Sequence, residues 1–257
     1  MPILSVERGE IYYEVSGKGF PVLLFAPGFL GSRIEHWRKP RAGHCAVPEW
    51  RNPIPALARD FKVITLDVRN AGRSWAEIGP DYDWPCYTAD HLALLDELGI
   101  DKCHVLGTCI GVSFALALAH AAPGRIASLV LQNPIGLSGE NRTVLDEQIA
   151  QWSGGLAARP DVSPSALRAV GPRMFGRDFV FSITRNAAGR VSAPTLLMPG
   201  NDRMHPPLVS ASLARLMKAE VVNPWKGKAH CDAALERARD FLIEHTPGQL
   251  AAGRFVS

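Results

Sequence analysis

The chain has 257 residues, which is enough for one α/β domain with a modest insertion and a large buried core. Its formal net charge of +3 at pH 7 is small and dispersed, which argues against a nucleic-acid-binding or membrane-surface protein. No stretch approaches the roughly 20 apolar residues of a membrane span, and no N-terminal run is long enough for a signal peptide. We therefore expect a soluble globular protein.

The five cysteines have neither a C-x-x-C pair nor the spacing of a zinc site. An odd number of cysteines without a secretory signal is typical of reduced thiols, so we expect a cytoplasmic protein. Cys103 is expected to fill the core on its strand. The cysteines without an expected role are Cys45, Cys86 and Cys231.

The first half of the chain alternates strands with short connections. Residues 3–16 predict two antiparallel strands that turn back near Gly9, and residues 21–26 form an apolar run typical of a strand buried on both faces. Residues 61–67 predict the next buried strand, and residues 87–98 have the apolar spacing of a helix.

Residues 103–111 read Cys-His-Val-Leu-Gly-Thr-Cys-Ile-Gly, and an apolar run follows them. The first half predicts a short buried strand, and the run predicts a helix. Cys109 therefore falls at a sharp turn, where we expect a strained backbone flanked by glycines that leave room for it. A side chain at such a turn projects above the sheet at the helix N-terminus. The G-x-C-x-G motif thus has the mechanics of a nucleophile elbow with cysteine as the nucleophile.

The second half resumes the alternation after an interruption. Residues 126–131 predict a strand, whereas residues 135–190 are rich in Gly, Pro, Ser and Arg and predict only short helices. Further strands are expected near residues 193–199 and 220–223. Helices are expected at residues 144–152, 164–170, 177–185, 207–218 and 231–245.

The elbow and its partners downstream resemble the α/β-hydrolase fold superfamily. The cysteine resembles the subset seen in dienelactone hydrolases and polyhydroxyalkanoate synthases. Arg-Asn-Ala-Gly before a serine at residues 69–74, with Cys-Ile-Gly at the elbow, is most similar to small bacterial α/β hydrolases, many without an assigned substrate.

The resemblance implies a mostly parallel eight-stranded sheet flanked by helices, with a helical cap inserted after strand 6. It implies a core domain of residues 1–134 and 191–257 and a cap of residues 135–190.

The resemblance also implies a catalytic triad. Asp202 lies in a Gly-x-x-Asp-x-x-x-Pro motif near residue 200, which carries the acid in this family, and His230 lies in the loop where the family places its histidine. Cys109 is thus expected to be the nucleophile, His230 the general base and acid, and Asp202 the residue that orients His230. Two other histidines compete with His230. We expect His205 to rim the pocket or support the acid loop, and we expect His104, which precedes the elbow inside a strand, to be an interior or edge histidine. The other position for an acid, after the sixth strand, holds Asn133.

The resemblance places the oxyanion hole at the backbone N–H groups of Phe29 and Ile110. Pro27 stands where the family commonly has a histidine. Asp67 and Arg69 are expected to brace their own turn rather than to take part in chemistry. Residues 33–47 look inserted beside the site, either as a wall of the substrate pocket or as a surface excursion.

The implied function is an acyl hydrolase that acts on an activated ester, a lactone or a thioester through a covalent thioester acyl-enzyme. Two alternatives stay open: an acyltransferase that uses the same acyl-enzyme, and a ligand-binding protein with a retained triad. We expect a small-molecule acyl substrate, no metal or organic cofactor, no nucleic acid and no membrane partner. The sequence leaves the oligomeric state open, a homodimer included.

Overall fold

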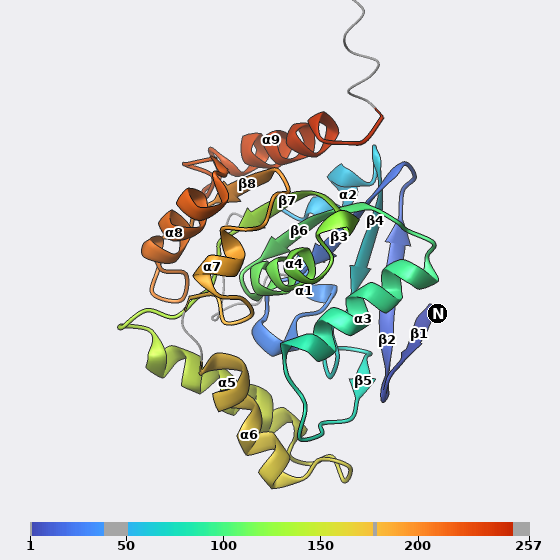
Figure 1. Ribbon diagram of the computed structural model, residues 1–257, viewed down its shortest axis with the longest axis vertical. Helices are drawn as coiled ribbons and strands as arrows, with labels where there is room; N and C mark the ends of the chain where they lie inside the picture. The colour runs from blue at the N-terminus through green and yellow to red at the C-terminus, as the bar shows by residue number, and fades with distance from the viewer. Residues whose placement is uncertain (1, 39–50, 177–178, 249–257) are drawn as a thin grey trace, which may run out of the picture.

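The computed structural model describes residues 2–38, 51–176 and 179–248. Within these ranges the sheet has the strand order β1-β2-β4-β3-β6-β7-β8-β9, and β5 pairs with β2 beside this path (Figure 1). The strands are β1 (Ile3–Val6), β2 (Gly9–Ser16), β3 (Phe20–Phe25), β4 (Phe61–Leu66), β5 (Trp75–Ala76), β6 (Cys103–Thr108), β7 (Ile126–Gln132), β8 (Thr195–Met198) and β9 (Glu220–Val221).

Helices cover both faces of this sheet. They are η1 (Phe29–Gly31), α1 (Glu35–Arg38), α2 (Pro53–Leu57), α3 (Trp84–Glu97), α4 (Ile110–Ala121), η2 (Pro123–Arg125), α5 (Arg142–Leu156), α6 (Pro164–Phe175), α7 (Arg185–Ala188), α8 (Pro207–Met217) and α9 (Cys231–Glu244). One core lies under α3, α4 and α8, and the other lies under α2 and α9. The expected mostly parallel sheet between helical layers is confirmed.

Parallel pairing brings the chemistry to one edge of the sheet. Strands β3, β6, β7 and β8 are parallel neighbours, so their carboxyl ends lie together. The loop after β3, the elbow after β6 and the loop after β8 therefore meet at that edge, where open α/β sheets bind their ligands.

The two polar residues expected to brace the turn after β4 are both buried, but only Asp67 bonds within that turn, whereas Arg69 ties it to α3. Arg69 forms a buried ion pair with Asp90, with 2.7 Å between Arg69 Nη2 and Asp90 Oδ1. Asp67 accepts hydrogen bonds from the backbone N–H groups of Ile34 and Arg73, so it braces the turn. Cys103 is fully buried, and burial raises the pKa of its thiol to about 12.

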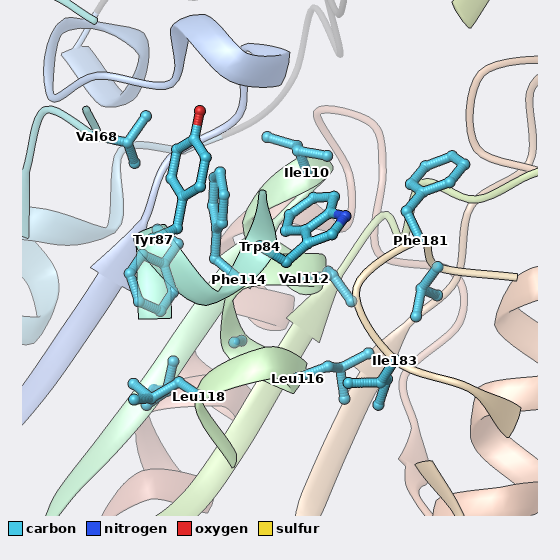
Figure 2. Close-up of a cluster of buried hydrophobic side chains, with 14 of the residues drawn as sticks. Val68, Trp84, Tyr87, Ile110, Val112, Phe114, Leu116, Leu118, Phe181 and Ile183 are labelled. Atoms are coloured by element: carbon cyan, nitrogen blue, oxygen red, sulfur yellow. The ribbon is translucent and has the colours of Figure 1, made fainter. Parts of the chain in front are cut away.

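The segment between β7 and β8 forms α5, α6 and α7, and we propose that it is a cap. Figure 1 shows α5 and α6 together at the end of the molecule opposite α9. The segment is fastened to the core, because the Trp84 indole N–H donates to the Met174 carbonyl at 2.8 Å and the Ser113 hydroxyl donates to the Val180 carbonyl at 2.8 Å. Figure 2 shows Phe181 and Ile183 packed beside side chains of α4.

The cap differs from the expectation in its third helix. The helix predicted at residues 177–185 begins outside the described residues, and residues 179–184 are not helical. Phe179 and Phe181 have positive φ angles of 66° and 69°, and both side chains are fully buried. Burying two aromatic rings in the core outweighs the local helical preference of this stretch.

Some expectations fall outside the described residues. The insertion expected at residues 33–47 is described only as far as residue 38, and Cys45 lies beyond that point. No helix in the described part of the chain is long and apolar enough to span a membrane.

Candidate active site

Cys109 occupies the turn between β6 and α4 in the strained conformation that the motif predicts. Its backbone angles are φ 57° and ψ −120°, and it is the residue immediately before the first turn of α4. A Cβ on Gly107 would lie 2.3 Å from the Gly111 carbonyl oxygen, and a Cβ on Gly111 would lie 2.2 Å from the Phe25 carbonyl oxygen. Close backbone contacts therefore require glycine at both positions, and the chain forms the strained turn that the motif predicts.

The loop after β8 holds a histidine and an acid in direct contact. The ring Nδ1 of His205 lies 2.8 Å and 2.9 Å from the two carboxylate oxygens of Asp202. The backbone N–H of His205 also donates to Asp202 Oδ1 at 2.9 Å. These bonds place the proton on Nδ1, because a carboxylate can only accept, and they leave Nε2 for another partner.

That other partner is the elbow thiol. His205 hydrogen-bonds to Cys109, and both side chains are buried, with exposures of 2% and 3%. Burial by itself lowers the pKa of His205, but the charge of Cys109 and the hydrogen bonds to Asp202 and Cys109 outweigh it and raise the pKa to about 9. The contacts with Asp202 and Cys109 thus favour the charged imidazolium form of His205.

Asp202 holds the charge that balances this imidazolium. Burial raises the pKa of Asp202, but the hydrogen bonds and the charge of His205, helped by Lys226, lower it overall to about 2. The Lys226 ammonium lies 3.6 Å from Asp202 Oδ2. Asp202 is thus a carboxylate throughout the neutral range and orients the His205 ring.

The histidine is where the structure departs from the sequence-based expectation. His230 is exposed, directly precedes α9 and makes no side-chain hydrogen bond or ion pair within the described residues. Its neighbour Asp232 pairs with Arg51, 2.5 Å away. The structure therefore brings Cys109 and Asp202 together with His205 rather than with His230, because His205 lies in the same loop as the acid and folds back into the core.

The sequence predicts only a supporting place for His205. The feature that could have indicated His205 as the partner of the thiol is its spacing of three residues from Asp202, because an acid and a histidine in one tight loop can pair without a second loop. The family pattern outweighed that signal, because the pattern assigns the histidine to a later loop.

Asn133 is fully buried at the end of β7, next to the elbow, and its backbone has a φ of 52°.

The loop after β3 is held from behind by a histidine. His36 Nδ1 lies 2.8 Å from the Pro27 carbonyl oxygen, so this nitrogen carries the proton that it donates. Gly28 has a φ of 121°, and a Cβ there would lie 2.2 Å from His36 Nδ1. His36 therefore supports the turn from which the N–H of Phe29 emerges, in a chain that has Pro27 at the usual histidine position.

An aromatic wall of the cap covers this loop. The Phe29 ring stacks on Phe175 of α6, with 4.5 Å between ring centroids, and Phe175 meets Phe181 edge-on at 5.0 Å. All three rings are buried, so the cap and the loop share one apolar contact. Within the described residues no group of three or more His, Cys, Asp and Glu side chains is arranged to hold a metal ion.

Comparisons with known proteins agree with this architecture. The model of the alpha/beta hydrolase fold family matches residues 21–166. A protein of Azorhizobium caulinodans named carbamate hydrolase RutD is 36% identical over 133 residues, which are 52% of this chain and 44% of that protein. A protein of the same name from Pseudomonas savastanoi pv. phaseolicola is 28% identical over 215 residues, covering 76% of this chain and 80% of that protein.

Solved structures show the same fold. The meta-cleavage product hydrolase of Pseudomonas fluorescens IP01 has a TM-score of 0.71 at 19% identity, over 96% of this chain and 98% of that one. The enol-lactonase of Burkholderia xenovorans LB400 has a TM-score of 0.66 at 22% identity, over 94% of this chain and 100% of that one. The chain spans less than half of the Azorhizobium relative, so its own reaction has to be argued from the site.

Proposed function

Because the chain belongs to the alpha/beta hydrolase fold family, we propose that it hydrolyses ester-type bonds by covalent catalysis at Cys109. The observation that carries this proposal is a chain of hydrogen bonds that joins the elbow to the loop after β8: Cys109 is hydrogen-bonded to His205, and His205 is hydrogen-bonded to Asp202. We assign His205, rather than His230, as the general acid and base. Asp202 keeps the ring oriented and the imidazolium charged.

The first half of the reaction forms a thioester. The Cys109 thiolate attacks the substrate carbonyl carbon, a C–S bond forms, and the carbonyl electron pair moves to oxygen. The backbone N–H groups of Phe29 and Ile110 stabilise this oxyanion, as the family resemblance suggests. When the tetrahedral intermediate collapses, the bond to the leaving group breaks, and His205 gives its proton to the departing oxygen or sulfur.

The second half restores the enzyme. Neutral His205 takes a proton from water as the water oxygen attacks the thioester carbon. The C–S bond then breaks, the carboxylic acid leaves, and the thiolate again faces an imidazolium. Activated esters, lactones and thioesters suit this chemistry, because a thiolate is a strong nucleophile and a good leaving group. The names of two relatives add a carbamate to the substrates worth assaying.

The direct test is to trap the acyl-enzyme. We expect p-nitrophenyl acetate to give a burst of p-nitrophenol and, after rapid acid quench, one acetyl group on the peptide that contains Cys109. Cys109→Ala is expected to lose both signals, and Cys103→Ala, which changes a buried thiol away from the turn, is the matched control. Acetylation at any other residue, or steady turnover by Cys109→Ala, would contradict covalent catalysis at Cys109.

The oxyanion loop provides a second, smaller prediction. Gly28→Ala is expected to lower kcat by about tenfold to a hundredfold, because the new Cβ would collide with His36 and displace the Phe29 N–H. Alkylation of Cys109 by iodoacetamide should be unchanged, since that reaction forms no oxyanion. Gly31→Ala is the matched control, because a Cβ there meets nothing within 4 Å. Equal kcat values for the two variants would argue against an oxyanion role for Phe29.

A further inference from the structure

A small hollow lies between the loop after β3 and the cap helix α5. Its volume is about 240 Å³. Gly28, Phe29 and Gly31 line one side, and Gln148, Gln151 and Trp152 of α5 line the other. Phe29 links the hollow to the proposed reaction centre, because it lines the hollow and its N–H group is one of the two that we assign to the oxyanion hole.

The described part of the lining carries one charge, and that charge is positive. Arg33 is the only charged residue that lines the hollow, and its guanidinium makes no ion pair or side-chain hydrogen bond within the described residues. The nearest buried acid, Asp67, lies behind Gly72 and is already held by Arg73 at 2.9 Å. Among the residues that the structure describes, Arg33 is thus a cation without a counter-charge, at the rim of a concave site.

Several side chains in this lining also have hydrogen-bond donors without a partner among the described residues. The amides of Gln148 and Gln151 have no side-chain partner within the described residues, and the buried indole Nε1 of Trp152 has none either. Asn70, by contrast, is engaged, because its Oδ1 accepts from the Ala76 backbone N–H at 2.9 Å. An uncompensated cation with free donors and no lining carboxylate is the chemistry that receives an anion.

We propose that this hollow binds a carboxylate carried by the acyl substrate away from its scissile carbonyl, with Arg33 as the counter-charge. This inference rests on the proposed function, since it names the class of substrate for the same site. A volume of 240 Å³ is below the roughly 300–1,000 Å³ of pockets that hold whole ligands, so the hollow suits one end of a substrate. A guanidinium recognises a carboxylate through two parallel hydrogen bonds, which gives orientation as well as attraction.

The test compares two substrates that differ only in charge. Mono-p-nitrophenyl adipate carries a free carboxylate, and its methyl ester is neutral. We expect the wild-type protein to prefer the acid, and Arg33→Gln to lower kcat/KM for the acid by about tenfold while leaving the methyl ester within about twofold. Arg33→Lys should keep part of the preference, and added salt should weaken it in the wild type. Arg215→Gln is the matched control, because Arg215 is exposed on α8 and makes no described side-chain contact.

A binding measurement separates this inference from the proposed function. Calorimetry with adipate and the Cys109→Ala protein needs no turnover, and we expect binding that Arg33→Gln weakens by about tenfold. If neither ester is hydrolysed, the proposed function fails, and the calorimetry alone decides the anion subsite. If the wild type shows no preference for the acid, or if Arg33→Gln and Arg215→Gln behave alike in both experiments, the subsite is overturned.

Discussion

His205→Ala is expected to lower kcat/KM for p-nitrophenyl acetate by about a hundredfold to ten-thousandfold, the range typical of a lost general acid and base. His230→Ala should stay within about twofold of the wild type, because exposed substitutions away from a site cost little. The physical reason is contact: His205 bonds to both Cys109 and Asp202, whereas the His230 ring is exposed. Steady-state kinetics of the two variants give the comparison.

Folding has to be controlled, because His205 is buried and His230 is not. His205→Gln keeps a similar size and a hydrogen-bonding amide but cannot shuttle a proton, so it should be as inactive as His205→Ala with a smaller loss of thermal stability. The melting temperature of each variant shows whether inactivity follows unfolding. An inactive His230→Ala variant, together with a folded and active His205→Gln variant, would show that His230 is the general base.

The state of the thiol is the second large expectation. We expect iodoacetamide to alkylate Cys109 at a rate nearly independent of pH between about pH 6.5 and 9, whereas the rate for a free thiol with a pKa of about 8.5 rises about tenfold per unit in the lower part of that range. The reason is that burial lowers the pKa of His205 but its contacts with Cys109 and Asp202 raise it overall to about 9, so a charged imidazolium stabilises the thiolate. Turnover should fall above about pH 9, because neutral His205 cannot protonate the leaving group.

Stability should follow the same titration. The folded chain keeps the His205 proton up to about pH 9, whereas the unfolded chain loses it near the ordinary value of 6.5. The contribution of His205 to the free energy of unfolding is therefore complete below about pH 6.5 and is lost as the pH rises towards 9. The Cys109 thiolate offsets this loss up to about pH 8.5, because the unfolded thiol keeps the proton that the folded thiolate has given up. Urea denaturation of the wild type should therefore give a free energy of unfolding that is nearly constant between about pH 6.5 and 8.5 and falls above about pH 8.5.

Cys109→Ser is the matched variant for the thiol. It should fold normally but lose about a hundredfold or more in kcat, because a hydroxyl is not ionised by an imidazolium and needs stronger base assistance. Alkylation of Cys109 that follows the free thiol through the pH range, together with full activity of Cys109→Ser, would show that the site works as a serine-type elbow that tolerates cysteine.

Local sequence was sufficient for the parts of this protein that depend on neighbouring residues. Continuous apolar runs predicted the parallel strands. Gly107 and Gly111 on either side of Cys109 predicted a strained elbow, and the φ of 57° at Cys109 confirms it. These features are local, because backbone sterics and burial act within a few residues. The non-helical stretch at residues 179–184 could not be predicted, because the burial of Phe179 and Phe181 depends on α4 and on the rest of the cap.

The sequence by itself therefore determined the sheet, the elbow and the presence of an acid after β8. It could not decide which histidine meets the thiol, because Cys109 and the two candidate histidines lie far apart in the chain and only packing sets their distances. The loop after β8 folds so that His205 is buried against both Asp202 and Cys109, whereas the chain before α9 leaves His230 exposed. The contacts of a side chain with distant segments, and not its place in a motif, thus decide its chemistry here.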